Sequence, residues 1–316
     1  MNLQALQTAR NSPDVVDAAG ILLRDLIDYA GLFPPASLAM ASSVANYEAY
    51  SRSEWNWILG RFILPVARLG EFEEAFDGLP IPPPETGVTN WRLSVLPDSD
   101  VAADVALIRE FNARMAGSSP GRKAVVESVE VKVESAGEVT RLSGIIPAEF
   151  ATYFEVPLSS CNECIEAVAG CGRRAKVRTG GETADKFPAP ASVVEFIRLC
   201  AAAHVPFKAT AGLHHPLRSV HRFTYQPQSP SGIMHGFLNV FLAAAFLRAG
   251  METGPAVQLL EEQSPGAFHF DLDGIGWRQH RLSQRELAAA RRDFAVSYGS
   301  CSFTEPIDDL RSLHLL

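Results

Sequence analysis

Three cationic side chains near the ends of two strand-like runs have the types and spacing to support chemistry. The run 175–178 carries Lys176 and Arg178 at alternate positions, and the run 205–210 carries Lys208. Because side chains alternate between the two faces of a strand, these cations point away from the apolar residues that would pack on helices. A buried lysine without a partner is very costly. We therefore expect carboxylate partners, or a reaction that needs a lysine with a lowered pKa.

The segment that contains these runs reads as strand, helix, strand. Thr179, Gly180 and Gly181 follow the first strand, and a second small pair follows the other strand. Between them, apolar residues at helical spacing predict a helix over 191–203. This order, with short connections, is the βαβ unit of a parallel sheet.

Further strand–helix units before this segment predict a (β/α)8 barrel of the TIM type. The other strand-like runs are 26–29, 61–66, 91–96, 124–133 and 152–156. The eighth strand is ambiguous, with 268–272 and the segment around 296–303 as candidates. An open doubly wound sheet would call for a glycine-rich turn after the first strand, and the sequence has none there.

The chain of 316 residues, 47% of them hydrophobic, suits one large core, so we expect a single barrel domain over 1–316. We expect an N-terminal arm or helix over 1–22 and C-terminal helices over 278–316, which extend the barrel. The stretch 217–232 is rich in Ser, Pro and Gln. Its length and composition predict a lid loop over the mouth, with Arg222 or Tyr225 reaching the ligand.

Polar residues on the inner faces of the predicted strands would meet at their carboxyl ends, where active sites of such barrels lie. These residues are Asp28, Glu130, Glu155, Lys176, Arg178, Lys208 and Thr210, with His214 and His215 just past the seventh strand. Carboxylates against lysines and an arginine make a charge-balanced interior. Two interpretations stay open, a layer of structural ion pairs and a functional site.

Three short motifs resemble those of deoxyribose-phosphate aldolases. They are LRDLIDYAGLFPPA at 23–36, KVRTGG at 176–181 and FKATAG at 207–212. In that family the lysine of the sixth strand forms a Schiff base with the substrate carbonyl. The lysine of the seventh strand lowers the pKa of the first, and an acidic residue on the fourth strand moves protons. The resemblance assigns these roles to Lys176, Lys208 and Glu130.

The sequence also departs from that family. Arg178 stands where the family prefers a small hydroxyl residue, and His214 and His215 replace its pattern after the seventh strand. Arg178 with the backbone of Thr179, Gly180 and Gly181 could hold a carboxylate or a phosphate of the substrate.

The function that follows is a class I lyase of the aldolase type that acts on a small carbonyl-containing metabolite. Its expected site has Lys176, Lys208 and Glu130 as catalytic residues. Its expected substrate-binding residues are Asp28, Glu155, Arg178, Thr179, Gly180, Gly181, Thr210, His214 and His215. This chemistry needs no cofactor and no metal.

Two other functions remain open. His214, His215 and His235, with Glu130 or Glu155, could bind a divalent metal for hydrolysis or isomerisation. Adjacent histidines seldom both ligate one metal, however, and His235 could simply cap a helix. A barrel that binds a small molecule without turnover is the second alternative, because the fold alone does not imply catalysis.

Charge and cysteine usage limit the partners and the compartment. The net charge of −8 argues against a nucleic-acid partner, and the longest apolar run, 236–247, is too short to span a bilayer. No basic stretch followed by an apolar core opens the chain, so no leader is expected. Three of the five cysteines form a C-x2-C-x6-C pattern typical of a helix with half-buried thiols. Reduced thiols suit the cytoplasm, and a homo-oligomer is left open.

Overall fold

The computed structural model describes residues 17–80, 89–117 and 122–316. Of the expected N-terminal arm, the described part contains helix α2 (Ala18–Leu23), and residues 1–16 lie outside it. Asp17 caps α2, because its side chain accepts a hydrogen bond from the Gly20 backbone nitrogen.

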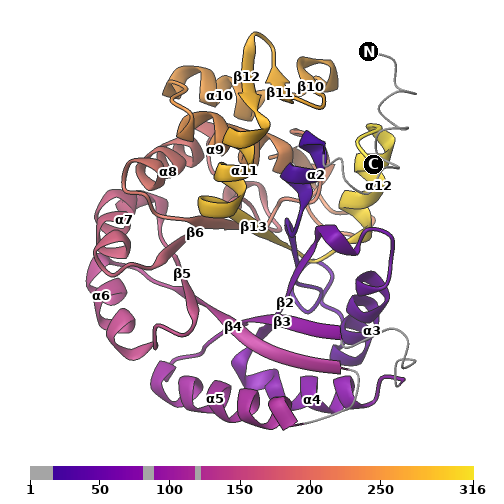
Figure 1. Ribbon diagram of the computed structural model, residues 1–316, viewed down its shortest axis with the longest axis vertical. Helices are drawn as coiled ribbons and strands as arrows, with labels where there is room; N and C mark the ends of the chain where they lie inside the picture. The colour runs from indigo at the N-terminus through magenta and orange to yellow at the C-terminus, as the bar shows by residue number, and fades with distance from the viewer. Residues whose placement is uncertain (1–16, 81–88, 118–121) are drawn as a thin grey trace.

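Eight parallel strands of the described residues close into a barrel ringed by helices (Figure 1). The strands are β1 (Ile27–Tyr29), β2 (Leu59–Pro65), β3 (Thr89–Leu96), β4 (Arg122–Lys132), β5 (Ala151–Glu155), β6 (Arg174–Arg178), β7 (Phe207–Thr210) and β13 (Ala295–Ser300). Their order around the barrel is β1-β13-β7-β6-β5-β4-β3-β2. The predicted (β/α)8 barrel is confirmed.

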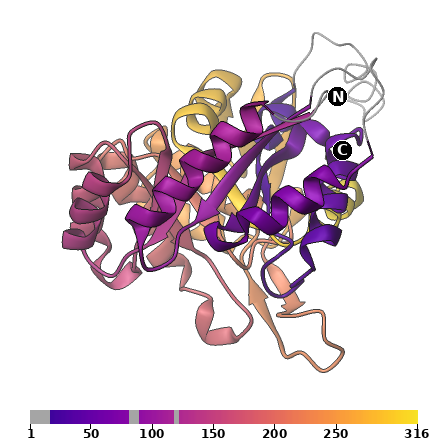
Figure 2. The same cartoon turned by 90° about the horizontal axis from the view of Figure 1, so that it is seen from below.

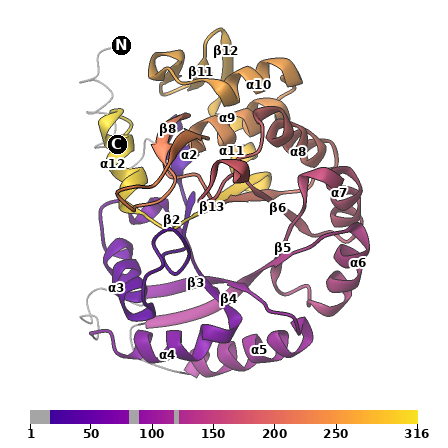
Figure 3. The same cartoon turned by 180° about the vertical axis from the view of Figure 1, so that it is seen from behind.

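Helices connect the strands and cover the outside of the barrel (Figures 1 and 3). They are α3 (Met40–Ser51), α4 (Leu69–Asp77), α5 (Val101–Gly117), α6 (Ala136–Ile145), α7 (Cys161–Gly170), α8 (Pro190–Ala202), α9 (Phe237–Arg248), α10 (Thr253–Glu261), α11 (Gln284–Asp293) and α12 (Thr304–Ser312). The C-x2-C-x6-C pattern runs the length of helix α7 and ends at its C-cap residue Cys171, and the first two of these thiols are buried in the core.

The eighth barrel strand is β13, which settles the choice between the two candidates. Strand β1 pairs with β13, with Asp28 opposite Gly299. The buried guanidinium of Arg291 in α11 strengthens this closure, because it donates to the backbone oxygens of Leu22 at 2.7 Å and Val296 at 2.7 Å. The segment 278–316, expected to be helical, therefore holds a barrel strand between its helices.

The other candidate for the eighth strand belongs to a separate antiparallel sheet. Its strands are β10 (Phe268–Phe270), β11 (Gly274–Trp277) and β12 (His280–Ser283). Gly274 has a φ of 159° at the start of β11, and an added Cβ there would lie 1.9 Å from the Leu282 oxygen. The Asp-Gly hairpin signal was correct, but the hairpin lies outside the barrel.

The stretch 217–232, expected to be a lid loop, forms a β-hairpin. Its strands are β8 (Ser219–Arg222) and β9 (Ser231–Met234). The hairpin projects from the same end of the barrel as the loop after β6 (Figure 2), and Phe223 stacks on Phe187 of that loop with ring centroids 5.1 Å apart. On the other side, the Tyr225 hydroxyl donates to Glu305 of α12 at 3.1 Å. Movement of this hairpin over the mouth stays a prediction.

Helix α9 is apolar on every side because neighbouring elements enclose it. Its residues from Phe237 to Leu247 are all buried, and α8, α10 and α11 contact it. The one amide inside, Asn239, donates to the backbone oxygens of Leu259 at 2.8 Å and Glu262 at 2.9 Å, so its burial leaves no donor unpaired. In the described part of the chain, no helix is long and apolar enough to cross a membrane.

Candidate functional site

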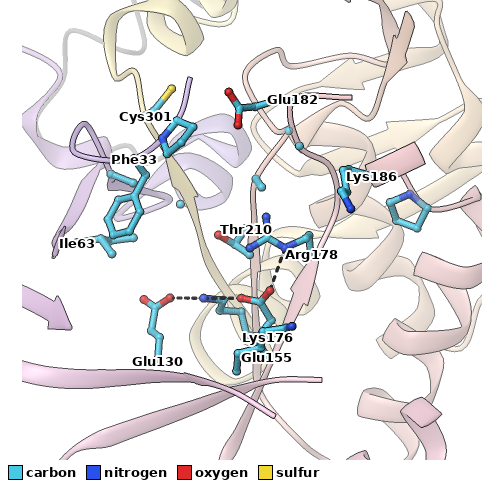
Figure 4. A pocket seen from close by; sticks show the side chains of 18 of the residues that line it. Phe33, Ile63, Glu130, Glu155, Lys176, Arg178, Glu182, Lys186, Thr210 and Cys301 are labelled. Atoms are coloured by element: carbon cyan, nitrogen blue, oxygen red, sulfur yellow. Dashed lines mark hydrogen bonds and ion pairs between the residues drawn. The ribbon is translucent and has the colours of Figure 1, made fainter. Parts of the chain in front are cut away.

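A cavity of about 890 Å³ opens at the carboxyl ends of the barrel strands. Lys176, Glu130 and Glu155 lie together in it, with Arg178 and Thr210 beside them (Figure 4). These residues come from β4, β5, β6 and β7, which are neighbours in the barrel. The alternation of side chains along each strand brings them to the interior, as the sequence predicted.

Lys176 binds two carboxylates. Its Nζ lies 2.9 Å from Glu130 Oε2 and 2.9 Å from Glu155 Oε2, and the residue is 3% exposed. Burial disfavours the charge on Lys176, but the two carboxylates outweigh this effect and raise the pKa of the ammonium. The expectation of a lowered pKa is therefore wrong for the protein without substrate.

Lys208 lies next to Lys176 and is fully enclosed. The two lysines are opposite each other in the β6–β7 register. Lys208 Nζ contacts Asp28 Oδ2 at 2.6 Å and Glu130 Oε1 at 2.5 Å, and it lies 5.3 Å from the centroid of the Tyr153 ring. Burial again disfavours the charged form of Lys208. The attraction of Asp28 and Glu130 outweighs this effect, so the pKa of Lys208 is raised.

The carboxylates at the base of the site have further donors. Ser94 donates to Glu130 Oε1 at 2.6 Å, and Ser297 donates to Asp28 Oδ2 at 2.7 Å. The Arg61 backbone nitrogen donates to Asp28 Oδ1 at 2.6 Å. Burial alone would raise the pKa of these acids, but the neighbouring lysines and donors lower it. Both carboxylates are therefore held charged.

Glu155 links Lys176 and Arg178, two of the cations of β6. Its Oε2 contacts Lys176, and its Oε1 accepts a hydrogen bond from Arg178 Nε at 3.0 Å. The side chain of Glu155 is 8% exposed, whereas that of Arg178 is 51% exposed. Burial would raise the pKa of Glu155, and the charges of Lys176 and Arg178 lower it overall.

Several expected substrate-binding residues hold the strand ends in place instead. Asp28 lies beneath Lys208, away from the cavity lining. Thr179 is buried and donates to the Ala211 backbone oxygen at 2.7 Å, which ties the end of β6 to the end of β7. Gly180 packs against Gly212, where an added Cβ would lie 2.9 Å from the Gly212 Cα. Gly181 and Thr210 do line the cavity.

The two adjacent histidines both approach Glu305, His214 at 3.3 Å and His215 at 3.9 Å, but only His214 lines the cavity. His214 lines the cavity, and its Nδ1 lies 3.3 Å from Glu305 Oε2. Burial would lower the pKa of His214, but the Cys301 sulfur and the Glu305 carboxylate raise it to about 9. His215 turns away from the cavity lining. Its Nδ1 contacts Asp309 Oδ2 at 2.6 Å, and its ring stacks on that of His221.

His235 is engaged at a third place. Its Nε2 lies 2.9 Å from the Pro188 oxygen, and its Nδ1 lies 3.1 Å from Arg218 Nη1. Among the described residues, no group of three His, Cys, Asp or Glu side chains could hold a metal ion. The donor geometry therefore gives no support to the metal-dependent alternative.

Sequence reasoning missed several residues of the cavity. Cys301, just after β13, could not be assigned while the eighth strand was uncertain. Phe33 and Ile63 were not among the expected site residues. Ser94, which does not line the cavity but donates to Glu130, carried a usable signal, because it is a small polar residue between Leu93 and Val95 of β3. No family model matches the chain, and no curated protein is similar to it.

Proposed function

We propose that the protein is a class I lyase of the aldolase type, in which Lys176 forms a Schiff base with a small carbonyl compound. The observation that carries the proposal is the position of Lys176, a buried amine that lines the cavity with a carboxylate 2.9 Å away on each of two strands. A nucleophilic lysine needs such a proton acceptor at hydrogen-bonding distance.

Proton transfer must come before the attack, since the pKa of Lys176 is raised. Glu130 or Glu155 takes one proton, and the neutral amine adds to the carbonyl carbon. The carbonyl oxygen then takes one proton from the amine nitrogen and one from the protonated carboxyl group and leaves as water, which gives an iminium ion. The iminium ion accepts the electron pair of the carbon–carbon bond one atom further along as that bond breaks, and a carboxylate takes the proton of the hydroxyl group on the leaving carbon, which becomes an aldehyde. Protonation of the resulting enamine and hydrolysis of the imine release the second product and restore the Lys176 amine.

Lys208 has an electrostatic role in this proposal. It is 0% exposed and does not line the cavity, so it does not contact the substrate. Its ammonium offsets part of the negative charge of Glu130, which would otherwise hold the proton on Lys176 more tightly.

The raised pKa of Lys176 favours a second candidate, a binding barrel without turnover. In that case Lys176 stays an ammonium and donates hydrogen bonds to a bound oxygen, and the carboxylates serve only to hold it. The two candidates differ in whether a covalent bond forms.

Hydrogen exchange on a ketone distinguishes them. An iminium ion acidifies the hydrogens on the neighbouring carbon, so a ketone incubated with the protein in deuterated water should exchange them, as followed by NMR. Lys176→Arg should abolish the exchange, because its guanidinium keeps the charge but forms no imine. Binding of the ketone without exchange would favour the binding barrel.

A further inference from the structure

The cavity has two walls of opposite character. Apolar side chains from the loop after β1, from β2 and from the end of β3 line one wall. These are Phe33, Pro35, Ile63 and Leu96. Polar and charged residues at and after β6 and β7, among them Arg178 and Lys186, line the other. In Figure 4, Phe33 and Ile63 lie across the cavity from these two cations.

Barrel topology makes the apolar wall face the reactive amine. Strand β2 lies four places from β6 in the order of eight strands, so Ile63 and Lys176 are on opposite sides of the barrel. A carbonyl carbon bonded to Lys176 would therefore project one substituent toward Ile63 and Phe33. Apolar surface buried against that wall gains free energy, whereas a hydroxyl group at the far end of the substituent, away from the carboxylate that serves the proposed cleavage, would lose its water without finding a partner.

Arg178, beside the Lys176 amine, is the best partner for a negative group of the ligand. The lysines at the rim of the cavity are less suitable. At the rim, Lys186 lies 3.4 Å from Asp185 and Lys132 lies 2.7 Å from Glu134, so acids offset both charges. Arg178 uses only its Nε, toward Glu155, and its two terminal nitrogens have no hydrogen-bond partner among the described residues. These nitrogens can bind a carboxylate bidentately.

The carbonyl and the negative group must also be close together in the ligand. Lys176 and Arg178 bind the two oxygens of one carboxylate, that of Glu155. A ligand with its carboxylate on Arg178 and its carbonyl at Lys176 therefore needs these two groups close together, as they are in an α-keto acid.

We propose that the site selects α-keto acids with an apolar side chain, with the carboxylate on Arg178 and the side chain against Phe33 and Ile63. The placement of the carbonyl at Lys176 rests on the proposed function. The carboxylate then shares the positive charge of Arg178 with Glu155. Glu155 loses part of its positive surroundings and becomes a better acceptor for the Lys176 proton, so binding of the acid group prepares the amine.

The test uses three compounds of similar size. They are the α-keto acid of leucine, the α-keto acid of asparagine, and methyl isobutyl ketone, which has a methyl group in place of the carboxylate. Binding is measured by calorimetry, and imine formation is measured separately by borohydride reduction. We expect the leucine analogue to bind about tenfold more tightly than either of the others.

Two variants test whether the apolar wall and Arg178 cause the expected binding preferences. Phe33→Ser should reduce the advantage of the leucine analogue over the asparagine analogue, and Arg178→Gln should reduce its advantage over the ketone. Leu107→Ser, on the exposed face of α5 and 49% exposed, is the matched control and should change neither.

The outcomes separate this inference from the proposed function. Equal binding and equal trapping of all three compounds would overturn the inference and leave the Schiff base intact. The expected order of binding without any trapped adduct would uphold the ligand class and overturn the lyase. No binding of the leucine analogue would overturn the inference.

Discussion

Lys176 and Lys208 share one carboxylate. Glu130 binds Lys176 through Oε2 at 2.9 Å and Lys208 through Oε1 at 2.5 Å, and all three side chains are almost fully buried. Two ammonium groups on neighbouring strands would repel each other strongly in the interior. The negative charge of Glu130 therefore compensates this repulsion.

Replacing this carboxylate should destabilise the fold. Glu130→Gln removes a charge that compensates two buried ammonium groups, and breaking a buried ion pair in this way costs about 3–5 kcal/mol. Urea unfolding measures the loss. Glu149→Gln, in an exposed ion pair with Arg109, is the control and should hardly change the midpoint. A loss in Glu130→Gln as small as in the control would contradict the bridging role.

Removing Lys208 should shift imine formation to higher pH. In Lys208→Met the negative charge of Glu130 acts on Lys176 with less compensation, so the pKa of Lys176 rises further. Rates of reductive trapping measured against pH should show a midpoint higher by about one unit or more. Lys123→Met changes an exposed residue at the opposite end of β4 and serves as the control. Coincident profiles for the wild type and Lys208→Met would remove the coupling between the two lysines.

His214 should make stability depend on pH. Its folded pKa is raised to about 9 by the Cys301 sulfur and Glu305 against the effect of burial. The charged imidazole therefore adds stability that is fully present below the unfolded pKa of about 6.5 and is lost as pH rises through about 9. Urea unfolding of the wild type and His214→Gln should differ by roughly 3 kcal/mol below about pH 6, and this difference should disappear above about pH 10. A difference that stays constant with pH would contradict this assignment.

The barrel could be predicted from the sequence because the alternation of side chains along each strand is visible within a few neighbouring residues. Alternation in β6 and β7 placed Lys176, Arg178 and Lys208 on the inner face, and the strand ends fell within a few residues of their observed positions. The eighth strand was ambiguous because β13 is recognised by its pairing with β1, from which it is separated by almost the whole chain.

The charge state of the site could not be predicted in the same way. Whether a second ammonium lowers the pKa of Lys176 or carboxylates raise it depends on distances across the barrel. Glu155 lies within 3 Å of Lys176 because β5 pairs with β6. The number of residues between them in the sequence does not indicate this distance. For the same reason, Thr179 and Asp28 were expected to meet the substrate, yet they bind the backbone and Lys208.

Chelators should leave the activity unchanged. Among the described residues, His214, His215 and His235 do not belong to any group of three donors that could hold a metal ion, and the Schiff-base route needs no metal. Exchange of ketone hydrogens should proceed equally before and after dialysis against EDTA. Loss of exchange on dialysis, with recovery when a divalent ion is added back, would favour the metal-dependent alternative.

Reductive trapping of Lys176 tests the central claim most directly. Borohydride is added to the protein with the α-keto acid of leucine and with a panel of aldehydes and ketones, and the peptides are then mapped by mass spectrometry. The wild type should gain the mass of the carbonyl compound less one oxygen atom on the peptide that contains KVRTGG, and Lys176→Arg should gain none there while keeping its circular dichroism spectrum. Absence of an adduct on Lys176 with every compound of the panel, in protein that remains folded, would contradict the Schiff-base function.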